Sequence, residues 1–479
     1  MKNIINKKGK DLFSFSLFRF LFKNEIFLQM LRLLITFTFF YAIFLGFIYP
    51  VKEENAFTTA LFWSLFWSFF MVLSLSTLGR VFCGICPHGF IGKYITKIGL
   101  NKKIPKKLAN PFIGLSIILG GYWLLIFLFP GIYRSPFNTS LFFLILTILS
   151  IVFFFIYKDM AYCKYICPLG TVTKVFSKIS FMKLETYKEG CSTCKTFDCA
   201  KACTYDLKPF TFNKKNSMED CTLCMDCATS CENVAFTINK PSSSLFSKFK
   251  IQKVEVWTLL ILTAILAFSM TIKHALNRTA IADEFIWNKI STYIKNITDI
   301  TFISIDGFTI LFFSIFTVIG LNILGMFVSS KILKIDYEKT FYTLSYALIP
   351  LFIIGGLAHI LEFFFVHYAS NIFNGFNEAF HVGLDPMEPL AKRGESWLLI
   401  FKVFPHIAYI WAFVLMFYRL KLLTEKINLR LLAFPFASIV IISYMSLNFY
   451  VGYVFKTYGV QKSGHNNASM QHKNIHKIN

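Results

Sequence analysis

Long apolar stretches separated by polar loops dominate the sequence and most constrain how the chain can fold. Each stretch runs for about 20 residues with few charges, the length that an α-helix needs to cross a hydrocarbon layer about 30 Å thick. Hydrophobic residues make up 55% of the 479 residues, more than a soluble core requires. We therefore expect a mostly α-helical, polytopic membrane protein. About nine spans are expected, at 31–50, 57–78, 112–130, 140–157, 256–272, 308–328, 341–366, 397–417 and 431–454.

The basic residues lie in loops beside these stretches and indicate an orientation. The loop 80–108 contains seven Lys or Arg and no acidic residue, and the first ten residues are also basic. The positive-inside rule then predicts a cytoplasmic N-terminus and, after nine spans, a periplasmic C-terminus in a bacterial inner membrane. No cleavable signal peptide is recognised. We attribute the net charge of +23 to topology and to contacts with anionic membrane lipid, not to nucleic acid.

A short Phe-rich segment precedes the first span. Residues 11–24 have cationic flanks and predict an amphipathic helix lying at the membrane interface. The alternative is an extension of the first span.

All 12 cysteines lie between Cys83 and Cys231, on the side predicted to be cytoplasmic, where structural disulfides are rare. Eight of them form two runs, CSTCKTFDCAKAC and CTLCMDCATSC, in the soluble insert 158–255. The second run has the C-x2-C-x2-C-x3-C spacing of bacterial ferredoxins, in which the fourth cysteine binds the other cluster. We assign one [4Fe–4S] cluster to Cys191, Cys194, Cys199 and Cys231, and a second to Cys203, Cys221, Cys224 and Cys227. Two four-cysteine zinc sites are the alternative.

The other four cysteines form two similar pairs. Cys83 and Cys86 follow the second span, and Cys163 and Cys167 follow the fourth. Each pair ends in Cys-Pro with a glycine two residues later (CPHG and CPLG), so that 57–97 and 140–178 form an internal repeat. Three interpretations stay open: a third cluster, a thiol/disulfide couple, or small buried cysteines at span ends.

These motifs, in this order, resemble the NapH/MauN-type membrane polyferredoxins, whose Cys-Pro motifs NosR and CcoG proteins share. The resemblance covers about 30–240, the first half of the chain. Cys163 and Cys167 match the family's C-x3-C-P pattern, whereas the pair Cys83 and Cys86 is one residue shorter. The resemblance implies electron transfer between membrane quinol and a redox partner, or, for CcoG-like members, reduction of copper during oxidase assembly. The flavin domain of NosR-like members has no counterpart in this sequence.

Ionisable residues within the later spans are candidates for a second site, because such residues are costly in a membrane. Span seven contains His359 and Glu362, and span eight contains Lys402 and His406. Counting inward from the predicted outer ends pairs Glu362 with Lys402 and His359 with His406 at matching depths. The alternatives are a b-type haem on the two histidines, a quinol site, or polar packing between helices.

The sequence thus predicts four parts: a four-span membrane domain with two Cys-Pro motifs (1–180), a ferredoxin-type α+β domain (181–240), a five-span membrane domain (250–455) and a polar tail (456–479). The tail contains His465, His472 and His476, which could bind copper or zinc but more often mark a disordered terminus. We expect an iron–sulfur electron-transfer protein, with a quinol-linked oxidoreductase or a subunit of one as its enzyme class. A metal-reducing assembly factor and a redox-sensing regulator are the competing functions.

Overall fold

The computed structural model describes residues 11–212, 218, 220–298 and 300–459, so the three tail histidines lie outside the described residues. Within this part of the chain, eight helical segments are long and apolar enough to cross a membrane, which confirms a multi-pass helical protein. They are Glu25–Ile48, Ala56–Thr77, Pro136–Ile156, Lys253–Arg278, Ile305–Leu333, Tyr337–Ala379, Ser396–Leu423 and Ile439–Tyr458. The expected span at 112–130 is a shorter apolar helix, Phe112–Leu128.

Four of the long helices are continuous and the others are segmented. The continuous helices are α2 (Glu25–Ile48), α9 (Pro136–Ile156), α17 (Ile305–Leu333) and α23 (Ile439–Tyr458). The segmented helices contain α3 (Ala56–Thr59) and α4 (Met71–Thr77); α14 (Lys253–Leu262) and α15 (Met270–His274); α18 (Tyr337–Leu344), α19 (Ile349–Phe363) and α20 (Ala369–Ala379); and α21 (Val403–Leu423). Wider π-helical turns join several of these pieces, at Ala60–Phe70, Thr263–Ser269 and Phe364–Tyr368. Another, at Leu119–Leu124, interrupts the shorter helix Phe112–Leu128.

The last expected span, 431–454, is wrong as a single helix. The structure divides it into α22 (Ile427–Ala437) and α23, with Ser438 between them. Pro435 lies inside α22 and cannot donate a backbone hydrogen bond, which weakens the helix at this point. The long segment at the seventh span also continues beyond the expected end, because α20 follows α19 through a π-helical turn.

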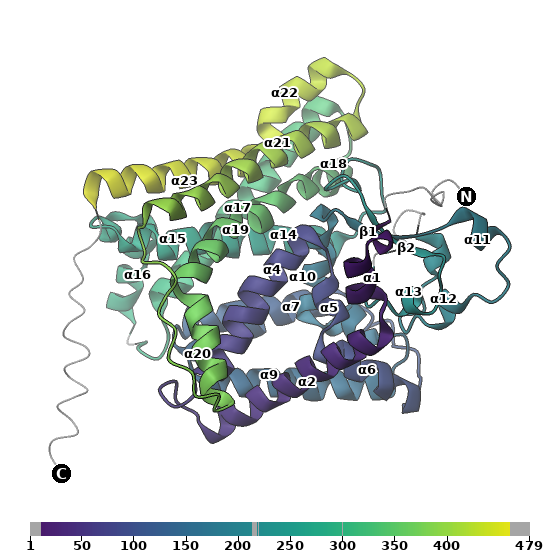
Figure 1. Ribbon diagram of the computed structural model, residues 1–479. Helices are drawn as coiled ribbons and strands as arrows, with labels where there is room; N and C mark the ends of the chain where they lie inside the picture. Colours follow the sequence, from purple (N-terminus) through teal and green to yellow (C-terminus); the bar gives the residue numbers. More distant parts are fainter. Residues whose placement is uncertain (1–10, 213–217, 219, 299, 460–479) are drawn as a thin grey trace, which may run out of the picture.

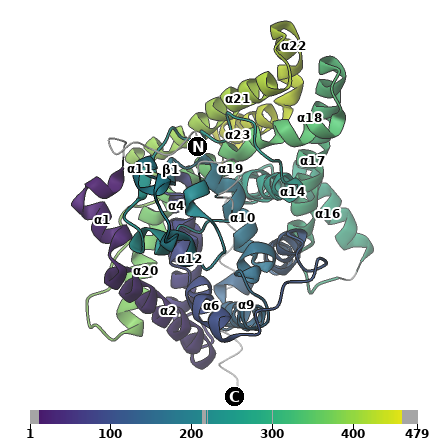
Figure 2. The ribbon, with the colours of Figure 1, turned by 90° about the vertical axis from the view of Figure 1, so that its right-hand side faces the viewer.

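The cysteine-rich insert lies at one end of the helical body. In Figure 1 it occupies the right-hand side, whereas α15 and α16 (Ile286–Ile297) lie toward the left. Figure 2 is a view from the insert end, with the insert in front of the membrane helices. The part of the insert that contains the two cysteine runs begins with β1 (Met182–Thr186), which pairs antiparallel with β2 (Val234–Ile238). Three short helices lie between the strands: α11 (Lys188–Ser192), α12 (Asp198–Lys201) and α13 (Asp226–Thr229).

The two cysteine runs fold alike at their third cysteine. The residue before α12, Phe197, and the residue before α13, Met225, both have left-handed backbone angles (φ 54° and φ 64°). Each is followed by an Asp-Cys pair that opens the short helix, so that the backbone reverses sharply just before Cys199 and Cys227. Equivalent turns in both runs indicate two related binding loops.

The N-terminal segment belongs to the insert as much as to the membrane domain. Helix α1 (Ser16–Lys23) is separate from α2, which Asn24 caps by accepting a hydrogen bond from the backbone N–H of Phe27. The ring of Phe22 packs 5.3 Å from that of Phe236 on β2. The separate helix agrees with the expectation, and one of its faces is covered by the insert.

The two membrane halves share one continuous hydrophobic core. At their boundary the ring centroids of Phe69 and Phe364 lie 4.4 Å apart in a stacked arrangement, and those of Phe176 and Phe352 lie 4.9 Å apart. Burial of these apolar surfaces fixes the second half of the chain against the half that carries the Cys-Pro motifs.

Candidate iron–sulfur and cysteine sites

Four cysteines of the insert surround one cavity. Cys203, from the first run, faces Cys221, Cys224 and Cys227, from the second, around about 310 Å³ of empty space. These are the four residues that the ferredoxin spacing assigned to a single cluster. Burial raises the pKa of Cys221 to about 12, and the neighbouring thiol of Cys203 adds to the shift. Positive charge from an iron cluster would offset this cost, because a coordinating thiol is deprotonated by the metal.

The remaining four cysteines of the insert also form a group. Burial is the largest cause that raises the pKa of Cys199 to about 11, and the charges of Cys231, Cys191 and Cys194 contribute. Cys194 is partly exposed, and its pKa is lowered by a hydrogen bond from the backbone N–H of Phe197. The structure therefore brings together both sets of four cysteines that the sequence proposed.

The donor sets fit iron–sulfur clusters better than zinc. Among the described residues, no three His, Cys, Asp or Glu side chains converge closely enough to hold a single metal ion. A zinc ion would require its thiolates to meet at one point, with Zn–S bonds of about 2.3 Å. Four cysteines spread around a cavity suit a larger cluster, whose iron corners each take one thiolate.

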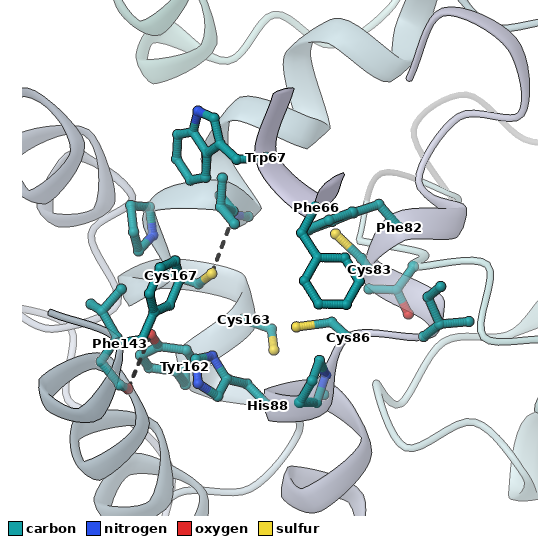
Figure 3. A pocket seen from close by; sticks show the side chains of 18 of the residues that line it. Phe66, Trp67, Phe82, Cys83, Cys86, His88, Phe143, Tyr162, Cys163 and Cys167 are labelled. Carbon is teal, nitrogen blue, oxygen red and sulfur yellow. Dashed lines mark hydrogen bonds between the residues drawn. The ribbon is translucent and has the colours of Figure 1, made fainter. Parts of the chain in front are cut away.

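The two Cys-Pro pairs meet in a chamber within the first membrane half. Figure 3 shows Cys83, Cys86, Cys163 and Cys167 around a common space, with Cys86 and Cys163 directed toward each other. The chamber encloses about 1100 Å³ of space that is partly open to the outside, and aromatic rings, including those of Phe66 and Trp67, form much of its wall. All four cysteines are free thiols. The repeat therefore does place its equivalent residues around one space.

Two π-helical segments contribute directly to the chamber. Ala60–Phe70 supplies Phe66 and Trp67, and Tyr162–Ile166 supplies Cys163. Such wider turns are frequent at functional sites, since they redirect side chains within a helix. A polar side chain, His88, lies in the same wall, and its Nε2 is 2.9 Å from the Thr147 hydroxyl.

The glycine of each CP-x-G motif has a similar position in the two repeat units. A Cβ on Gly170 would lie 2.5 Å from the carbonyl oxygen of Cys163, and one on Gly89 would lie 3.4 Å from that of Cys83. Each glycine thus allows the backbone of the first cysteine of its pair to approach the following helix. The contact is closer in the second unit, which has the longer C-x3-C spacing.

The chamber and the cavity of the insert share a wall. Tyr205 and Thr222 line both spaces. The Tyr205 hydroxyl is hydrogen-bonded to the Cys163 thiol, so that a residue of the insert reaches into the chamber. The insert is held in this position by Arg32 of α2, whose guanidinium lies 3.2 Å from Asp226 and donates to the backbone carbonyls of Gly84 and Cys224.

The pairs expected in the later spans do not form. Helices α19 and α21 pack against each other as predicted. Among the described residues, however, no ion pair joins Glu362 to Lys402, and the ring of His406 contacts Tyr409 and Phe449 instead of His359. Matching depth along two helices does not determine which face each residue occupies. His359 instead faces His274, with ring centroids 6.3 Å apart.

Comparison with known proteins identifies the repeat. A sequence model described as a 4Fe-4S binding domain matches the chain twice, at residues 59–107 and 139–185, which correspond to the two repeat units. Uncharacterized protein MJ0750 of Methanocaldococcus jannaschii is 31% identical over 187 residues, covering 35% of this chain and 75% of that protein. The chain belongs to this 4Fe-4S binding family.

Two further relatives match over a smaller share of their length. Uncharacterized protein MJ0749 of the same organism is 28% identical over 169 residues, covering 34% of this chain and 65% of the relative. The Escherichia coli K12 protein named "Putative electron transport protein YccM" is 29% identical over 205 residues, covering 36% of this chain and 56% of that protein. No solved structure matches the chain. These matches support an iron–sulfur family in general and do not single out the NapH/MauN type.

Several residues of the site were not found from the sequence. Arg32 carried a usable signal, because a lone arginine within an apolar helix requires a buried partner. His274 lies two residues beyond the expected end of span five and was treated as part of a loop. Tyr205 and Gly84 carried no signal, since their roles depend on contacts between distant segments.

Proposed function

We propose that this protein transfers electrons within the membrane, between quinol and a redox partner. The path runs through two [4Fe–4S] clusters in the insert and a third centre held by the four chamber cysteines. The observation that carries the proposal is the shared wall, because Tyr205 and Thr222 line both the chamber and the cavity around Cys203, Cys221, Cys224 and Cys227. A centre in one space would be separated from a centre in the other by about one layer of side chains.

The family match supports the third centre. Both segments matched by the 4Fe-4S binding domain contain one Cys-Pro pair, whereas the eight cysteines of the insert lie outside them. The chamber cysteines thus belong to the part of the chain that defines the family. The name of the Escherichia coli relative supports electron transport as the role of such a centre.

The residues present would each contribute to this function in a defined way. Bound clusters would supply one-electron transfer. Four thiolates would hold each of them, and Tyr205 would donate a hydrogen bond to one of the chamber sulfurs. The aromatic wall excludes water and offers an apolar surface to a quinol ring, with the His88 imidazole within the same lining.

Metal analysis of the purified full-length protein tests the proposal. Three clusters correspond to about twelve iron and twelve sulfide per chain, and two to about eight. The Cys83→Ser variant should lose about four irons while the EPR signals of the insert clusters remain. An unchanged count would mean that the chamber holds no cluster, and zinc in place of iron would overturn the whole assignment.

The quinol step requires a separate measurement. In proteoliposomes a soluble quinol should reduce the clusters of the wild-type protein, and a Phe66→Trp variant that narrows the chamber should slow this reduction. Failure of the wild-type clusters to accept electrons from quinols, with dithionite reducing them normally, would contradict quinol as the donor.

A further inference from the structure

A second group of metal-ligating side chains lies away from the cysteines. His274 ends α15, and His359 lies in the last turns of α19, so that two segments far apart in sequence contribute one imidazole each. The side chains of His274 and His359 are both exposed. Their ring centroids are 6.3 Å apart and their planes are tilted by 33°. The sequence suggested His359 with His406 as its partner, whereas the structure places His274 beside it.

This separation matches two imidazoles that bind opposite sides of one metal. An imidazole nitrogen lies about 2 Å from a bound metal and about 1 Å from its own ring centre, so trans ligands place their ring centres about 6 Å apart. The tilt is compatible with such binding, because each ring can rotate about its own bond to the metal.

The surrounding charges distinguish between a bare metal ion and a haem. Arg278, Lys273 and Arg393 all act electrostatically on His274, and both arginines also act on His359. A cationic surrounding opposes binding of a free metal cation. It favours a metal carried by an anionic group, and the two propionates of haem are carboxylates of the kind that arginine binds through paired hydrogen bonds.

Aromatic contacts connect the histidine pair to the cysteine chamber. The Phe363 ring lies 4.0 Å from the His359 ring and 5.8 Å from the Tyr368 ring. The Tyr368 side chain is hydrogen-bonded to Ser68, which follows the chamber residue Trp67 in sequence. A redox group at the histidine pair would therefore lie along packed side chains that lead to the chamber.

We propose that His274 and His359 are the two axial ligands of a b-type haem, with Arg278 and Arg393 bound to its propionates. In its redox reaction the ferric iron would take up one electron, supplied by oxidation of one reduced centre of the cysteine sites, and would return it in the reverse step. The haem would lie at the end of the fifth span, on the side away from the insert (Figure 1).

Optical spectroscopy of the full-length protein, purified from cells supplied with a haem precursor, tests the proposal. We expect one haem b per chain by pyridine haemochrome, with a low-spin spectrum. His274→Ala and His359→Ala should each lower the haem content about tenfold or more, with sulfide content unchanged. His406→Ala is the matched control and should keep the haem. The His274→Met variant should retain haem with a shifted spectrum, since methionine is itself an axial ligand.

Three results would overturn the proposal. They are a wild-type protein that binds no haem even after addition of haemin, haem retained in His274→Ala, and zinc or copper bound at the histidine pair instead. Because the sulfide content is measured in the same samples, failure of the haem assignment is distinguishable from failure of the iron–sulfur function.

Discussion

At the scale of single residues, one hydrogen bond couples the insert to the chamber. The Tyr205 hydroxyl donates to the Cys163 thiol, and Tyr205 lines both cavities. Hydrogen bonds to the sulfur ligands are among the factors that set the potential of an iron–sulfur centre. A residue of the insert therefore has a direct means of tuning a centre bound in the membrane half.

Replacing Tyr205 with Phe should lower the reduction potential of the chamber centre. The change removes a donor that stabilises the extra negative charge of the reduced state, and a shift on the order of tens of millivolts is expected. EPR-monitored redox titration measures it. Tyr162→Phe is the control, because the Tyr162 hydroxyl is directed to the backbone carbonyl of Leu146 at 3.5 Å and not to a thiol. Equal potentials in Tyr205→Phe and the wild type would contradict this role.

The sequence predicted residues best where a local spacing carries the chemistry. The grouping of Cys203 with Cys221, Cys224 and Cys227 follows from the ferredoxin pattern, and the structure places the four around one cavity. The pairing of His359 with His406 rested on depth alone, and was wrong. Depth follows from the rise per residue of a helix, whereas the direction of a side chain depends on how the helix is rotated against its neighbours.

At the scale of elements, a buried ion pair attaches the insert to the first span. The side chains of Arg32 on α2 and Asp226 on α13 are largely buried, and Lys93 of α6 (Pro87–Ile98) lies 2.8 Å from the same carboxylate. Asp226 precedes Cys227, so the attachment acts on the loop that carries the cysteines. This contact positions the cavity of the insert against the membrane half.

Replacing Arg32 with Ala should destabilise the attached insert by about 1 to 3 kcal/mol, because it removes the buried hydrogen bonds to Asp226, Gly84 and Cys224, while Lys93 still pairs with the carboxylate. We expect faster loss of cluster absorbance in air and easier proteolysis of the insert. Lys201→Ala is the control: its pair with Asp198 is exposed, and its removal should change stability by less than about 1 kcal/mol. Equal cluster lifetimes in the two variants would contradict the positioning role of Arg32.

Close backbone packing at Gly84 provides a second attachment of the insert. A Cβ at this position would lie 2.6 Å from the carbonyl oxygen of Leu223, between two cysteines of the cluster loop. Gly84→Ala should therefore displace this loop and raise the fraction of protein that lacks one insert cluster, as measured by sulfide content. In Gly120→Ala no atom lies within 4 Å of the new Cβ, so the content should not change. A full complement of sulfide in Gly84→Ala would show that the loop accommodates the methyl group.

The long helices were largely predictable, because apolar stretches of membrane length can be recognised in the sequence. The π-helical segments that interrupt these helices were less predictable. The π-helical segment Ala60–Phe70, which supplies Phe66 and Trp67 to the chamber, has the same apolar composition as a regular helix. Its wider turns arise from packing against other segments, and packing of this kind is not encoded by local periodicity.

At the scale of the whole molecule, polar contacts as well as apolar packing join the two membrane halves. Glu255 of α14 is almost fully buried, and its carboxylate lies 3.1 Å from Lys178, which follows the second Cys-Pro motif. The Tyr346 hydroxyl donates to the same carboxylate. The second half of the chain thus contacts the first close to the cysteine chamber, which allows a redox group in one half to communicate with the other.

Replacing Lys178 with Met should lower the melting temperature, because it removes the buried ion pair between Lys178 and Glu255. The cost of breaking a buried pair is about 3 to 5 kcal/mol, and replacing both partners with apolar residues is often neutral. We therefore expect the double variant Lys178→Met/Glu255→Leu to recover much of the lost stability, measured by intrinsic tryptophan fluorescence in detergent. If the double variant were less stable than Lys178→Met by the full effect of losing Glu255, the two residues would act independently, and the ion pair would not join the halves.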